Sequence, residues 1–192
     1  MKVYILTIIV CFSFCTTVNA QKEASLLNSP NDWRAETLNL PLSFAPELDY
    51  EGIEYVRFAK GWGNAASEEF WTYKFAWYLD VDPKLTTERL NKELKLYFDG
   101  LLNAVGKGKG LSKETIIPAK ATIAYNKESA SYLGNVTIFD VFFKEALQTL
   151  NVKITSSYCD ITKKHIVYFE FSPQPYQHKL WETMNNITIL CK

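Results

Sequence analysis

The stretch FWTYKFAWYL at residues 70–79 carries the clearest strand pattern in the chain. Its odd-numbered positions are all large and apolar, whereas its even-numbered positions include Thr72 and Lys74. Side chains two positions apart point to the same face of a strand. One aromatic face and one mixed face predict a strand that is buried on one side and partly wet on the other.

Residues 86–105 carry the clearest helix pattern. Thr86 suits the N-cap, and Glu88 lies where the helix dipole favours a negative charge. Gly106 is expected to end the helix in a left-handed conformation. The apolar positions recur at helical spacing, at Leu90, Leu94, Leu101 and Val105.

Further strands are expected on both sides of this helix. Pro41 interrupts an alternating apolar pattern at 38–44, which predicts an edge strand. The short connections between the later segments favour antiparallel pairing. Apolar residues after Pro175 recur at helical spacing and predict a C-terminal helix. Residues 186–191 could continue this helix or form an edge strand, and the sequence leaves both alternatives open. The other expected strands are 53–59, 120–125, 136–143, 152–159 and 165–172.

These elements together predict an α+β fold. We expect a curved antiparallel sheet of about five to six strands, packed by one long helix, with a shorter C-terminal helix. Residues 32–192 are expected to form a single domain, because no linker or internal repeat divides them. Residues 21–31 are polar and rich in small side chains, and are expected to be a flexible leader.

The first twenty residues have the pattern of a secretory signal peptide. Lys2 supplies a positive charge, residues 3–14 are an apolar run, and Val18 and Ala20 are the small residues before a cleavage site. The run is too short for a bilayer, which takes roughly 20 residues. The sequence therefore predicts a secreted or periplasmic protein with no transmembrane segment in the mature chain.

Two cysteines remain after residues 1–20 are removed. Cys159 and Cys191 form an even pair in an oxidising compartment, which favours a disulfide. The alternative is two buried free thiols.

Charge and motifs exclude several function classes. The chain has 21 Lys+Arg and 21 Asp+Glu, so it lacks the basic excess of a nucleic-acid-binding protein. Its two histidines, His165 and His178, form no metal-binding motif. The glycines of 100–110 do not have the spacing of a phosphate-binding loop. We expect no metal and no cofactor.

Two carboxylates are the candidate catalytic groups. Asp140 and Glu170 each lie among apolar strand residues, where a carboxylate must be paired, hydrogen-bonded or shifted in pKa. If they faced each other across the sheet, they would suit a hydrolase with an acid/base pair. The alternative is a structural role for both.

A loop tryptophan is the best candidate for a ligand contact. Trp62 stands between Gly61 and Gly63, close in sequence to Arg57 and Lys60, and loops often carry function. Tyr78 is expected to add to this site from the wetter face of its strand. We expect a non-catalytic domain that binds a small molecule, a glycan or a protein partner. The alternatives are the two-carboxylate hydrolase and a structural protein of the cell envelope.

Overall fold

The computed structural model describes residues 26–191. The expected signal peptide and residues 21–25 of the expected leader lie outside this range. Within the described range, no helix is both long enough and apolar enough to cross a membrane.

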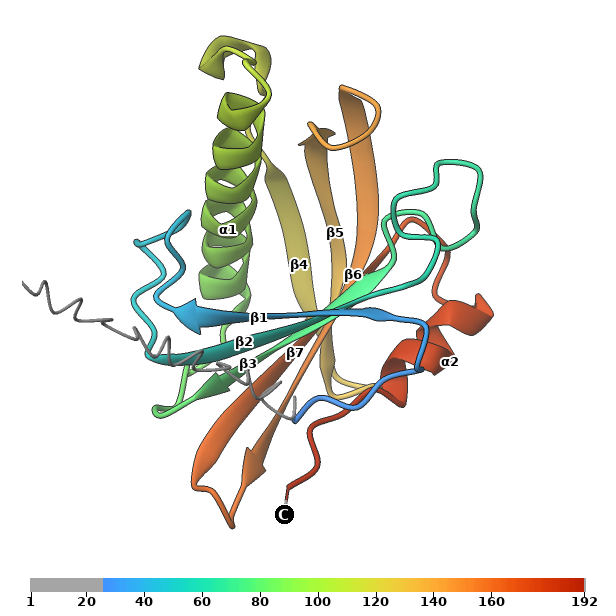
Figure 1. The fold of residues 1–192 in the computed structure, drawn as a ribbon. Coiled ribbons are helices and arrows are strands. Elements are labelled where there is room, and N and C mark those ends of the chain that lie inside the picture. Colours follow the sequence, from blue (N-terminus) through green and yellow to red (C-terminus); the bar gives the residue numbers. More distant parts are fainter. Residues whose placement is uncertain (1–25, 192) are drawn as a thin grey trace, which may run out of the picture.

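Seven strands in the described part of the chain form one antiparallel sheet, in the order β1-β2-β3-β7-β6-β5-β4. The strands are β1 (Arg34–Leu40), β2 (Gly52–Phe58), β3 (Tyr73–Leu79), β4 (Lys120–Asn126), β5 (Ser131–Asp140), β6 (Ala146–Cys159) and β7 (Lys164–Ser172). Strands β1–β3 cross β4–β6 at a large angle, so the sheet is strongly twisted (Figure 1). The α+β fold is confirmed, with seven strands rather than five to six. β1 is an outer strand, as expected for this part of the chain, but it ends at Leu40, so only residues 38–40 of the alternating stretch 38–44 belong to it.

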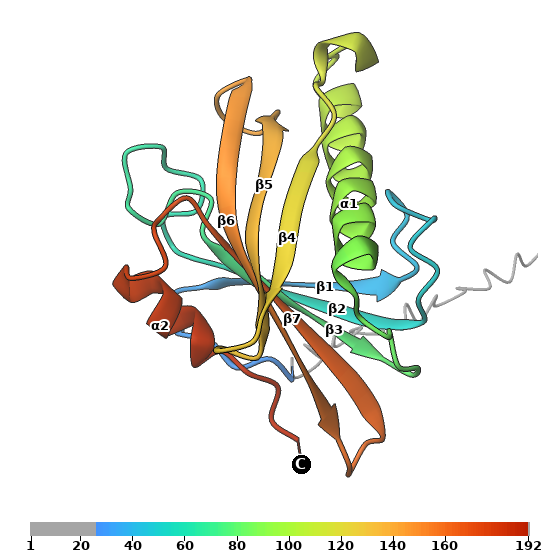
Figure 2. The same cartoon turned by 180° about the vertical axis from the view of Figure 1, so that it is seen from behind.

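Helix α1 (Thr87–Gly108) stands against β4 on one face of the sheet (Figure 2). The Thr86 hydroxyl accepts the Arg89 N–H at 3.1 Å, which confirms the predicted cap. The predicted stop at Gly106 is wrong, because α1 continues for two more residues. Gly106 is buried instead, and a Cβ there would lie 2.4 Å from the Ile116 side chain, next to the 3-10 turn η1 (Lys113–Thr115). This glycine allows close packing rather than a turn.

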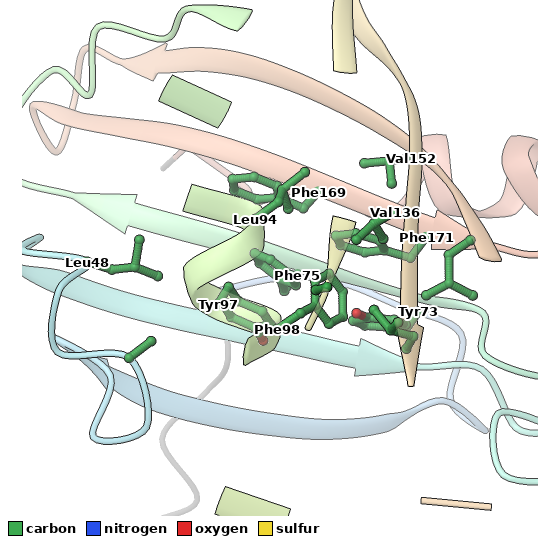
Figure 3. Close-up of a cluster of buried hydrophobic side chains, with 14 of the residues drawn as sticks. Leu48, Tyr73, Phe75, Leu94, Tyr97, Phe98, Val136, Val152, Phe169 and Phe171 are labelled. Carbon is green, nitrogen blue, oxygen red and sulfur yellow. The ribbon is translucent and has the colours of Figure 1, made fainter. Parts of the chain in front are cut away.

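The face under α1 holds the larger hydrophobic core. Aromatic rings of β3 and β7 lie in rows beneath rings of the helix (Figure 3). Phe75 stacks on Phe169 with centroids 4.6 Å apart, and Tyr97 of α1 stacks on Phe75 at 5.0 Å. The aromatic face predicted for the 70–79 segment is therefore the core face, although the strand begins only at Tyr73 and residues 70–72 lie in the turn before it.

The opposite face of β3 is also buried, contrary to the expectation of a partly wet face. Lys74 and Tyr78 point to this side and are 2% and 8% exposed. The covering layer comes from residues 27–33, helix α2 (Lys179–Asn185) and the C-terminal residues that follow it. Local alternation cannot reveal this layer, since its segments lie far from β3 in the sequence.

Residues 26–31 are held by the fold, although they belong to the predicted flexible leader. Leu27 is buried and pairs with Ile189 in an antiparallel bridge. The side chain of Arg57 donates hydrogen bonds to the Leu27 carbonyl and the Ser29 hydroxyl. Residues 186–191 form neither the helix nor the edge strand left open by the sequence, because α2 ends at Asn185 and Ile189 makes only this isolated bridge.

The Cys159–Cys191 disulfide is confirmed and closes a loop between residues 32 apart in sequence. We expect a Cys159→Ser/Cys191→Ser double variant to lose roughly 3–4 kcal/mol of unfolding free energy, because the unfolded chain gains loop entropy. Urea unfolding at constant pH measures the difference. Reductant should then leave the midpoint of the double variant unchanged. Equal unfolding free energies for the oxidised native protein and the double variant would contradict the prediction.

Candidate functional site

A cavity of about 260 Å³ opens beside α1, over the core face of β1, β2 and β3. We call it the aromatic cavity, because half of its fourteen lining residues carry aromatic rings. These rings are Phe44, Phe58, Trp62, Trp71, Tyr73, Tyr97 and Phe142. Small-molecule sites are typically concave and mostly apolar, with a few polar groups that fix orientation.

The strand register explains why these side chains meet. Arg34 pairs with Phe58, which pairs with Tyr73, so one row of the sheet leads from the cavity mouth into the core. Four residues further along, Leu38 pairs with Glu54, which pairs with Trp77. Because side chains alternate between faces, these rows all point toward α1.

Trp62 folds back onto the core from the glycine-flanked loop. Its ring lies 4.8 Å from Phe58, 5.4 Å from Trp71 and 4.9 Å from Phe143. A side chain on Gly61 would collide with Ser67, since a Cβ there would lie 2.2 Å from the serine hydroxyl. The tight loop therefore depends on glycine at position 61 and brings the tryptophan ring to the cavity wall.

Trp71, next to this ring, has a strained backbone. Its φ is 53°, in the left-handed region that bulky residues avoid at a cost of about 1–3 kcal/mol. The Trp71 N–H donates to the Trp62 carbonyl at 3.0 Å, which ties the two tryptophans together. Strain of this kind gathers at binding and catalytic sites.

Three residues that line the cavity each hold a buried donor with no hydrogen-bond partner among the described residues. These donors are Nε1 of Trp62, Nε1 of Trp71 and the hydroxyl of Tyr73. An unsatisfied buried polar group costs about 1–3 kcal/mol, so native proteins rarely keep one without a reason. The described residues hold only two other such atoms, on Glu93 and Glu170.

Glu54 is a fully buried carboxyl on the inner wall of the cavity. It accepts hydrogen bonds from Trp77 Nε1 at 2.7 Å and from the Tyr97 hydroxyl at 3.0 Å. Burial raises the pKa of Glu54 to about 7, and the two hydrogen bonds offset only part of this rise. Burial and the nearby Glu54 charge also raise the pKa of Tyr73 and Tyr97 well above the ordinary value.

Of the four predicted binding residues, the cavity contains only Trp62. Arg57 and Tyr78 point to the opposite face of the sheet, because each lies an odd number of positions from a core-facing neighbour on its strand. Arg57 anchors residues 27–29 there, and Tyr78 packs against Tyr55. Lys60 is exposed in the loop.

The structure does not bring the two candidate catalytic carboxylates together. Asp140 pairs with Ala146 of β6, whereas Glu170 pairs with Lys153. Seven residues of strand separate these partners by about 23 Å, and the odd spacing places them on opposite faces.

Each of these carboxylates has structural contacts of its own. Asp140 accepts the backbone N–H groups of Phe142, Phe143 and Lys144, and so fixes the turn that carries Phe142 into the cavity wall. Glu170 accepts a hydrogen bond from buried Lys74 at 2.7 Å. Neither faces the other as an acid/base pair would.

A second, larger hollow is an open groove of about 650 Å³ at the other end of the same face. Tyr125 and Tyr158 line it and are half exposed. None of the unpartnered buried atoms of the described residues belongs to this groove. The aromatic cavity is therefore the stronger candidate site.

Comparison of the chain with protein-family models, with curated proteins and with solved structures gives no match. The role of the cavity must therefore be inferred from its own geometry and chemistry.

Sequence reasoning missed Glu54, Trp71, Tyr73 and Tyr97 as site residues. Glu54 carries the same signal that singled out Asp140, a carboxylate with apolar neighbours on the same strand face. The importance of Tyr73 and Tyr97 depends on the contact between β3 and α1, which no local pattern reports.

We expect Glu54 to make the protein less stable as pH rises from about 4.5 to about 7. The folded protein keeps the proton of Glu54 in this range, whereas the unfolded chain has released it. Each pH unit contributes about 1.4 kcal/mol, so a Glu54→Gln variant should gain about 3 kcal/mol relative to the native protein across the range. Urea unfolding of both proteins between pH 4 and pH 8 measures the difference. A constant difference over that range would contradict the raised pKa.

Proposed function

We propose that the protein binds a small, largely apolar molecule that carries an oxygen acceptor, and that the aromatic cavity is the binding site. The observation that carries this proposal is the gathering of three unpartnered buried donors around one cavity. An indole N–H only donates hydrogen bonds, so its partner must be an acceptor. A ligand oxygen supplies that acceptor.

The dimensions of the cavity favour a compact ligand. Its 260 Å³ equals the liquid volume of about nine water molecules, at about 30 Å³ each. A single ring with a short substituent has this size. The aromatic walls provide the area for stacking and edge-to-face contacts with such a ring.

The residue types around the cavity favour binding over catalysis. Within the described chain, its lining contains no histidine, cysteine, serine or lysine. Activated nucleophiles usually need one of these groups beside a base. Glu54 accepts hydrogen bonds from an indole N–H and from the Tyr97 hydroxyl, and the raised pKa of Tyr97 makes that hydroxyl a poor nucleophile.

We also propose that the protein works outside the cytoplasm. The signal-peptide pattern of residues 1–20 supports export. The Cys159–Cys191 disulfide is compatible with an oxidising compartment, because cytoplasmic thiols are kept reduced.

Tyrosol, a phenol ring with a two-carbon alcohol, is a suitable neutral probe. We expect it to quench tryptophan fluorescence and to bind the Tyr73→Phe variant about two- to tenfold more weakly, which corresponds to one lost hydrogen bond. The unliganded variant should be as stable as the native protein or more stable, because an unsatisfied buried hydroxyl is removed.

Tyr125→Phe is the matched control, since Tyr125 is half exposed and lies in the open groove. It should leave tyrosol binding unchanged. Equal effects of the two substitutions on affinity would contradict a role for the cavity. A loss of stability in Tyr73→Phe would point to a structural role for this hydroxyl.

A further inference from the structure

Charged side chains occur at both ends of the aromatic cavity. Arg34 and Glu36 line its mouth, with side chains 58% and 45% exposed. Glu54 lies at the buried end. When Glu54 is ionised, the lining carries one more negative than positive group.

Arg34 shows that the rings at the mouth accept a cation. Its guanidinium carbon lies 4.4 Å from the centroid of Phe58 and 5.4 Å from that of Trp62. A cation over an aromatic face is attracted by the ring quadrupole. Arg34 also forms a 3.4 Å ion pair with Glu36, and exposed pairs of this kind are weak.

The hydrogen bonds that Glu54 accepts come from two neutral donors, an indole N–H and a phenol. An ionised carboxylate in such surroundings is destabilised unless a cation accompanies it. The groups that act on Glu54 are Trp77 and Tyr97, which lower its pKa, and Glu36, which raises it. A ligand cation at this end of the cavity would stabilise the ionised carboxyl.

We propose that the natural ligand is a small organic cation, a primary amine on an aromatic body, whose ammonium group pairs with Glu54. This inference rests on the proposed function, because it specifies the charge of the molecule that enters the cavity. The apolar body lies between the rings of the wall, and an oxygen of the ligand accepts a hydrogen bond from an unpartnered donor of the lining residues.

A series of three probes tests the charge preference. Tyramine, tyrosol and 4-hydroxyphenylacetate share a phenol ring and differ in carrying a positive, a neutral or a negative group. Calorimetry at pH 8 should give a dissociation constant for tyramine at least tenfold below that for tyrosol, with 4-hydroxyphenylacetate the weakest.

The affinity for tyramine should also rise about tenfold from pH 6 to pH 8, as the ionised fraction of a carboxyl with a pKa near 7 increases. The charged and titratable groups around Glu54 are Arg34 and Glu36 on β1, Tyr73 on β3 and Tyr97 on α1. Both tyrosines have strongly raised pKa values, so they keep their protons in this range.

Two variants separate the alternatives. Glu54→Gln should reduce tyramine affinity to that of tyrosol, whereas the exposed control Glu47→Gln should not. Arg34→Gln should tighten tyramine binding two- to fivefold, because a positive charge that repels the ligand ammonium is removed from the cavity lining. If Glu54→Gln fails to fold, the pH series on the native protein still decides the question.

Each failure has a distinct meaning. Equal affinities for tyramine and tyrosol overturn the amine inference and leave the cavity as a site for neutral molecules. Preference for 4-hydroxyphenylacetate, lost in Arg34→Gln, overturns it in favour of an anion. Absence of binding by all three probes overturns the proposed function itself.

Discussion

The burial of β3 on both faces is the constraint on which the rest of the structure depends. Its core face supplies the rings that stack on β7 and α1. Its other face carries Lys74, and a lysine buried to this extent requires partners. Lys74 donates to Glu170 at 2.7 Å and to the Met184 carbonyl at 2.8 Å. The first bond joins β3 to β7, and the second fixes the end of α2 against the sheet.

The aromatic cavity follows from the shape of the sheet and the position of its long helix. Helix α1 packs chiefly against β4 and β5, so it leaves the core face of β1 and β2 partly uncovered. The loop that carries Trp62 and the turn that carries Phe142 close this region from the side. Trp62 and Phe142 add aromatic rings to the cavity wall but do not fill the cavity. The cavity is therefore formed by five separate segments of the chain, 34–44, 54–62, 71–73, 97–105 and residue 142, around a sheet that is wider than its helix.

The sequence predicts what depends on local periodicity. The core face of β3 and the cap of α1 at Thr86 are both visible in residues a few positions apart. The layer that covers the second face of β3 comes from residues near both ends of the described chain. Local alternation therefore predicts an exposed Tyr78, and this prediction is wrong. Arg57 and Phe58 are neighbours in the sequence, so their side chains point to opposite faces of β2. The same alternation, applied to residues 53–59, places Arg57 on the face away from Trp62. Glu54 could have been found in the same way as Asp140.

The two faces of the sheet differ in how well their polar groups are satisfied. On the α2 side, Lys74 is paired with Glu170, and Thr72 shares a 2.8 Å hydrogen bond with Ser172, so that one oxygen of Glu170 is the unpartnered buried atom there among the described residues. The cavity side is less well satisfied. The residues that line the aromatic cavity include a strained tryptophan, three unpartnered donors and a carboxyl with a raised pKa. Selection for folding alone would have removed these costs, since apolar replacements are available at each position. Their concentration at one cavity is what a binding site requires, because a ligand gains most affinity from groups that the protein itself leaves unsatisfied.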